Sequence, residues 1–135
     1  MLNTHWDHIS NAARRKSAKL IRERLTELSE HLPTIVMGDL NAPEESPATT
    51  TLIGAANPQG GMLIDSYRKL NPKRTPEEAT FNSWEGKTAG SRIDFILHSK
   101  QFSQTAAEIV RTSYDGRWPS DHYPITATLQ LESKP

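Results

Sequence analysis

The chain of 135 residues contains 16 basic and 16 acidic side chains, five histidines and no cysteine. This length suits one domain with its own core, so we treat residues 1–135 as a single domain. The balanced charge provides no long-range attraction to a polyanion, and the lack of cysteine excludes disulfides and thiolate sites. No long apolar run occurs, so we expect no membrane span and no signal peptide, and the sequence indicates no cellular compartment.

The N-terminal part reads as strand, helix and strand. Residues 1–6 resemble a strand, and from Ser10 to Leu32 apolar residues recur every three or four positions, which predicts an amphipathic helix capped at Ser10 or Asn11. The many charged side chains of this segment are typical of a solvated helix face. Pro33 ends the helix, and the apolar residues 34–37 predict a strand that is covered on both sides.

The remaining elements extend this pattern. Residues 42–61 are rich in proline, threonine and glycine, which indicates a loop with a short helix near 48–53, and residues 62–70 are compatible with a strand or a helix. After a loop at 72–78, further strands are expected at 80–84, 91–98, 108–113 and 125–131. This order predicts the α/β class, with one mixed β-sheet backed by helices.

Polar side chains interrupt or end several of these strands. Asp39 and Asn41 follow the strand at 34–37, in a segment that fits either an ordinary Asx turn or a ligand site at the end of a sheet strand. Asp94 interrupts an otherwise apolar strand. A carboxylate there is costly unless it is paired, coordinated, or on the solvent face of an edge strand.

Two histidines extend the set of candidate groups. Asp121 and His122 precede the last strand, either in a surface turn or as a cation ligand beside a histidine that reaches a reacting oxygen. His5 ends the first strand, where a single histidine is ordinarily a satisfied polar residue. Ser120, Asp121 and His122 do not form a hydrolase triad, because adjacent side chains diverge. Taken together, these oxygen-rich groups suit Mg²⁺ or Mn²⁺, which leaves the histidines for proton transfer or charge stabilisation.

Four short segments carry a family resemblance: NTH at 3–5, GDLN at 38–41, RIDFI at 92–96 and SDHYP at 120–124. In this order and at these separations, the chain resembles the C-terminal half of the endonuclease/exonuclease/phosphatase superfamily. The resemblance implies the deoxyribonuclease-I-like fold, so that the chain is half of a four-layer α/β/β/α sandwich. It also implies a phosphoesterase that depends on Mg²⁺ or Mn²⁺.

The resemblance gives three of the matching residues a role at the phosphate. His5 is similar to the histidine that binds the scissile phosphate and protonates a leaving oxygen, and Asp39 to the carboxylate that orients or deprotonates the attacking water. Asn41 is similar to a residue that donates to the phosphate. Strand alternation would point Asp39 and Asn41 in the same direction.

The other matching residues lie in the C-terminal part. Asp94 resembles the aspartate that pairs with the final histidine of the family, here His122, and Asp121 resembles the C-terminal metal ligand. Phe81 and Trp84 are aromatic residues near these motifs that suit either stacking on a substrate or packing in the core, and of these two uses we expect core packing.

Family members are considerably longer, and their N-terminal half supplies an asparagine and the principal metal-binding glutamate. We therefore expect a truncated fragment with reduced activity and with the apolar inner face of its sheet exposed. Such a face predicts a homodimer in which two copies pack sheet against sheet. The expected substrate is a phosphate ester, as in nucleic acid, an inositol phosphate or a phospholipid head group. An alternative function is a catalytically silent folding or interaction module.

Overall fold

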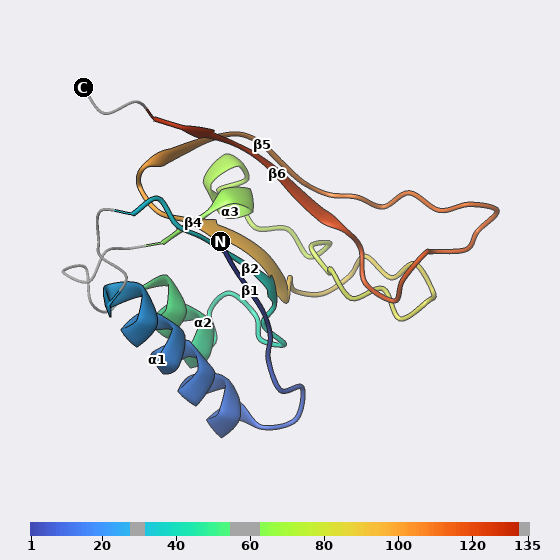
Figure 1. The fold of residues 1–135 in the computed structure, drawn as a ribbon. Helices are drawn as coiled ribbons and strands as arrows, with labels where there is room; N and C mark the ends of the chain where they lie inside the picture. The colour runs from blue at the N-terminus through green and yellow to red at the C-terminus, as the bar shows by residue number, and fades with distance from the viewer. Residues whose placement is uncertain (28–31, 55–62, 133–135) are drawn as a thin grey trace.

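The protein consists of helices packed on a mixed β-sheet, with a β-hairpin beside it (Figure 1). The computed structural model describes residues 1–27, 32–54 and 63–132. The elements in chain order are β1 (Leu2–His5), α1 (Asn11–Glu27), β2 (Ile35–Asp39), α2 (Pro47–Ile53), β3 (Ile64–Asp65), α3 (Ser66–Leu70), β4 (Asp94–His98), β5 (Phe102–Ile109) and β6 (Ile125–Leu131). This arrangement confirms the predicted α/β class. None of the helices in the described ranges is long and apolar enough to cross a membrane.

The first β–α–β unit forms as predicted. Helix α1 begins after Ser10, whose hydroxyl accepts a hydrogen bond from the N–H of Ala13 at 3.2 Å, so Ser10 is its N-cap. One turn earlier, Asp7 accepts bonds from the N–H groups of Ser10 and Ile9, and these bonds hold the pKa of Asp7 below its ordinary value. Helix α1 ends at Glu27. The predicted helix extends to Leu32, which lies outside any helix, and residues 28–31 between them lie outside the described residues.

The four-stranded sheet has the order β1-β2-β4-β3. Strand β2 pairs parallel with β1 and antiparallel with β4, and β3 pairs antiparallel with β4. Strands β5 and β6 pair with each other in a second, two-stranded sheet. The strands thus divide over two sheets where one was expected. The cause is the connection after β4, a tight turn from Ser99 to Phe102 that directs β5 over α3.

The hydrophobic core lies between one face of the four-stranded sheet and helices α1 and α2 (Figure 1). Its buried residues are Trp6, Ala18, Ile21, Val36, Leu40, Ala48, Leu52, Leu63, Phe95 and Leu97. Helix α3 and the hairpin contact β4, and Ile96 faces them from the other side of that strand. On this second face Ile35, Met37 and Ile96 are only partly buried. The apolar face that the sequence predicts is therefore partly open.

The segment at 80–84 is a loop and not the predicted strand. Ser83 and Trp84 have φ angles of 58° and 61°, which an extended strand excludes. The cause is local, because Oδ1 of Asn82 accepts a hydrogen bond from the N–H of Trp84 at 2.8 Å and closes a turn. Phe81 keeps one strand-like contact, an antiparallel bridge to His122.

Other elements keep their place with shifted bounds. The short helix expected near 48–53 is α2, and the segment 62–70, compatible with either type, contains β3 followed by α3. The strand expected at 91–98 begins at Asp94. Of the strand expected at 108–113, only residues 108 and 109 lie in a strand, as the end of β5, and residues 110–113 do not. Polar residues at 103–105 interrupt the apolar alternation in the earlier part of β5.

Gly38 allows β1 and β2 to approach each other. A Cβ at this position would lie 1.8 Å from the carbonyl oxygen of Thr4, and its φ is 134°. We expect Gly38→Ala to lower the free energy of unfolding by about 3 kcal/mol or more, because the backbone of β1 has to move. Urea unfolding measures this loss.

Gly116→Ala is the matched control. Gly116 also has a positive φ, 72°, but no atom lies within 4 Å of the added Cβ. Its loss should be only the left-handed strain of about 1 kcal/mol. Equal losses for the two variants would contradict the close approach at Gly38.

Candidate active site

Three polar side chains lie in a row across three neighbouring strands. His5 of β1 pairs in register with Asp39 of β2, and Asp39 pairs with Asp94 of β4. Residues paired across neighbouring strands project from the same face, so these three side chains share the face opposite the core. Nε2 of His5 lies 3.3 Å from Oδ2 of Asp39.

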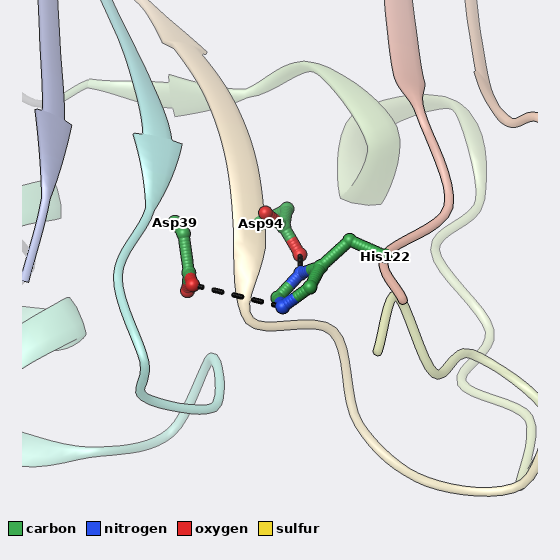
Figure 2. A group of neighbouring side chains, drawn as sticks. All are labelled: Asp39, Asp94 and His122. Carbon is green, nitrogen blue, oxygen red and sulfur yellow. Dashed lines mark hydrogen bonds and ion pairs between the residues drawn. The ribbon is translucent and has the colours of Figure 1, made fainter. Parts of the chain in front are cut away.

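His122 reaches this row from the segment that leads into β6 (Figure 2). Its Nδ1 lies 2.9 Å from Oδ2 of Asp94, and its Nε2 lies 3.9 Å from Oδ2 of Asp39. Figure 2 shows the imidazole between the two carboxylates. Because a carboxylate accepts hydrogen bonds, the contact with Asp94 assigns a proton to Nδ1 and directs Nε2 toward Asp39.

The environment of Asp39 favours its protonated form. Burial raises the pKa of this carboxyl and the charge of Asp94 adds to the effect, while the N–H of Asn41 and the two histidines act in the opposite direction. The net shift is upward. A carboxylate whose pKa is raised is a stronger base than a free one, which suits proton abstraction.

Asn41 combines both interpretations of its segment. Its N–H donates to Oδ1 of Asp39 at 2.7 Å, which is an Asx turn, and its φ of 46° takes it out of the strand. Strand alternation therefore does not align Asp39 with Asn41, contrary to the expectation. The turn nevertheless brings Asn41 to the same cavity. Its side-chain amide donates to the carbonyl oxygen of Trp6 at 2.8 Å.

One open cavity of about 610 Å³ collects the candidate residues. Its lining includes all six that the sequence singles out, which are His5, Asp39, Asn41, Asp94, Asp121 and His122. The ligand atoms of Asp39, Asp94 and His122 all lie within 4.8 Å of one another, which is close enough for one metal ion. Asp121, the expected metal ligand, lines the cavity outside this group of three and accepts from the hydroxyl of Ser120 at 3.3 Å.

Phe81, Ile93 and His8 complete the lining. Phe81 is 45% exposed and Trp84 is 59% exposed, so the expectation that both pack in the core is wrong. The turn at Asn82 directs this segment outward. An asparagine that can form such a turn is the sequence signal for this exposure, and the hydrophobicity of the segment does not reveal it. The ring of Phe81 lies 5.2 Å from the imidazole of His122 in an edge-on contact.

A buried arginine, Arg92, lies two residues before the start of β4 and fixes this part of the chain to its neighbours. The guanidinium of Arg92 lies 4.7 Å from the ring centre of Tyr67 and 4.8 Å from that of Phe95. It donates to Asp65 at 2.6 Å and to Glu44 at 3.0 Å. Burial acts to raise the pKa of Glu44, but the hydrogen bond from Arg68 and the neighbouring arginine charges outweigh burial and lower it. Arg92 thus anchors the strand that carries Asp94.

The comparison with protein families agrees with the motifs. The sequence pattern of the Endonuclease/Exonuclease/phosphatase family matches residues 2–122. No curated protein matches the chain.

Several solved structures share the fold. A mannosyl-6-phosphatase from Bacteroides thetaiotaomicron is 31% identical, with a TM-score of 0.79 over 96% of this chain and 50% of that chain. The human Nocturnin catalytic domain has 18% identity and a TM-score of 0.71 over 96% of this chain and 46% of that one. D. rerio TDP2, in complex with a single-stranded DNA product, has 19% identity and a TM-score of 0.70 over 96% and 55%. The chain thus spans about half the length of the structures it matches.

Proposed function

Because the chain belongs to the Endonuclease/Exonuclease/phosphatase family, we propose that its cavity is the active site of a metal-dependent phosphoesterase. The observation that carries this proposal is the placement of His122 between Asp94 and Asp39 on one face of the sheet. Two partly buried carboxylates at paired positions destabilise a fold unless a cation or a proton donor lies between them. This arrangement suits proton transfer and the binding of a cation, both of which phosphoester hydrolysis uses.

Asp39 and His122 act on the attacking water and on the phosphate. Asp39, with its raised pKa, orients the water and takes its proton. The Nδ1–H group of His122 donates a hydrogen bond to Asp94, and this bond fixes the ring and stabilises a positive charge on it. Nε2 then faces the cavity beside Asp39 and stabilises negative charge that develops on the phosphate oxygens.

His5 and Asn41 bind the phosphate from the other side. The side chain of His5 is 74% exposed and lies at the edge of the row, where it can donate to a phosphate oxygen or protonate the leaving oxygen. The amide of Asn41 has two N–H bonds, and the contact with Trp6 uses one of them. The other is available for the phosphate.

A divalent cation such as Mg²⁺ fits the chemistry of this lining. The donors are mainly carboxylate oxygens, which Mg²⁺ prefers, and no thiolate competes because the chain lacks cysteine. Asp121, the expected metal ligand on this lining, would hold the ion, while Asp39, Asp94 and His122 keep the roles given above. When bound, the cation polarises the phosphate and neutralises developing charge.

The apolar part of the lining suggests the alcohol portion of the ester. Phe81 and Ile93 line the cavity next to His122, so the phosphate and the organic group can occupy adjacent places. The 31% identical structure is a mannosyl-6-phosphatase, and we propose a sugar phosphate as the first substrate to test. Nucleic acid, inositol phosphates and phospholipid head groups are the alternatives, and the balanced charge disfavours tight binding of nucleic acid.

The test is hydrolysis of mannose 6-phosphate and of chromogenic phosphomonoesters and phosphodiesters with Mg²⁺ or Mn²⁺. We expect low but measurable turnover, lost with a chelator and restored by added metal. His122→Ala should lower kcat/KM by about 100-fold or more, because it removes the imidazole that lies beside Asp39 and stabilises negative charge on the phosphate. Asp94→Asn should have an effect of similar size.

Asp115→Asn is the control, since this exposed carboxylate lies outside the cavity lining. Its kcat/KM should match that of the unaltered chain. Turnover that survives both the chelator and His122→Ala would contradict the proposal and would favour the silent folding or interaction module.

We further propose that the partly open apolar face is covered by a second copy of the chain. Ile35, Met37 and Ile96 lie on this face beside the site and are only partly buried, and apolar surface that remains open favours association. Light scattering should give twice the 15.1 kDa mass of one chain. Met37→Glu should restore the single-chain mass, because a charge on the face opposes burial. A folded monomer of the unaltered chain at micromolar concentration would contradict this proposal.

A further inference from the structure

Thr80 is a fully buried polar residue that the proposed mechanism leaves without a role. Its hydroxyl oxygen accepts hydrogen bonds from two successive backbone groups, the N–H of Ile93 at 3.0 Å and the N–H of Asp94 at 3.2 Å. Its own carbonyl oxygen accepts from the N–H of Tyr123 at 2.7 Å. A single residue thus connects the start of β4 with the segment that carries His122.

The connection continues to β2. The N–H of Leu40 donates to the carbonyl oxygen of Ile93 at 2.8 Å, so the peptide that Thr80 holds also holds the residue after Asp39. A chain of hydrogen bonds therefore runs from Leu40 through Ile93 and Thr80 to Tyr123. Each of the three clustered side chains is part of this chain or adjacent to it in sequence.

Asn82 fixes the same loop to the segment before His122. It is fully buried, its side-chain amide donates to the carbonyl oxygen of Ser120 at 3.0 Å, and its N–H donates to that of Asp121 at 2.7 Å. Its Oδ1 accepts from the N–H of Trp84. The loop between Thr80 and Trp84 is thereby attached to both sides of the Asp94–His122 contact.

We propose that Thr80, supported by Asn82, is a positioning residue that sets the separation of the Asp94 carboxylate from the His122 imidazole. A hydroxyl suits this position because it has two acceptor lone pairs for two adjacent N–H groups, which an apolar side chain of the same shape would leave unpaired. The expected effect of Thr80 on the rate rests on the proposed phosphoesterase function. Its expected effect on the separation of Asp94 from His122 is independent of that function.

Thr80→Val and Thr80→Ser separate the hydroxyl from the shape of the side chain. Valine keeps the shape and loses the acceptor, whereas serine keeps the acceptor. We expect Thr80→Val to lower kcat about tenfold or more while KM changes little, because displaced catalytic groups lose rate more than binding. Thr80→Ser should retain most of the rate. Thr51→Val is the matched control, since the Thr51 hydroxyl donates to a carbonyl oxygen within the exposed part of α2.

A second measurement needs no activity. In the NMR spectrum of the unaltered chain, the Nδ1 proton of His122 should give a slowly exchanging downfield signal, because it donates to Asp94. The signal should persist in Thr80→Ser and Thr51→Val and be lost in Thr80→Val, with faster amide exchange at Ile93 and Asp94. Asn82→Asp is the second variant, for use if Thr80→Val does not fold. It keeps the acceptor for the N–H of Trp84 but loses the donor to Ser120, and it should weaken the His122 signal.

The outcomes distinguish the two proposals. An unaltered chain without turnover, whose His122 signal still depends on the Thr80 hydroxyl, would contradict the phosphoesterase and support the positioning role. A His122 signal and a rate that are unchanged in Thr80→Val would overturn the positioning role. It would equally be overturned if Thr80→Ser behaved like Thr80→Val.

Discussion

The register of β2 between its two neighbours is the constraint on which the site depends. Asp39 is paired with His5 on one side and with Asp94 on the other, so all three side chains project from one face at the same level of the sheet. A slip of one residue in the pairing of β2 with β4 would turn a carboxylate toward the hydrophobic core, at a free-energy cost of several kcal/mol for an unpaired ion, about the stability margin of a small domain. The absence of a side chain at Gly38 permits the close parallel pairing of β1 with β2.

This arrangement concentrates negative charge where the fold gains nothing from it. Asp39 and Asp94 are paired positions, both largely shielded from solvent, and the charge of Asp94 helps to raise the pKa of Asp39. His122 relieves part of this repulsion by donating to Asp94 and approaching Asp39. A bound cation or a bound proton can offset the remaining unfavourable charge. The two close carboxylates are therefore the feature of the fold that points most directly to a binding site. Two other residues hold Asp94 and His122 in position. Arg92 anchors the start of β4 through its ion pair with Asp65, and the hydroxyl of Thr80 accepts a hydrogen bond from the N–H of Ile93.

Much of the fold and the site follows from local sequence. The strand–helix–strand start was predictable because apolar spacing, the cap at Ser10 and the break at Pro33 all act within a few residues. The convergence of the six candidate residues was predictable only through the family motifs, since each segment alone fits an ordinary turn. What escaped prediction depends on tertiary contacts. The exposure of Phe81 follows from the buried Asn82, and the course of β5 follows from its packing over α3.

The central claim is that His5, Asn41 and His122 face one phosphate on one side of the sheet. Titration with inorganic phosphate in the presence of Mg²⁺, followed by NMR, tests it most directly. The imidazole signals of both histidines and the side-chain amide signal of Asn41 should shift together along one saturation curve. Signals that follow separate curves, or that stay fixed while residues outside the cavity shift, would contradict it.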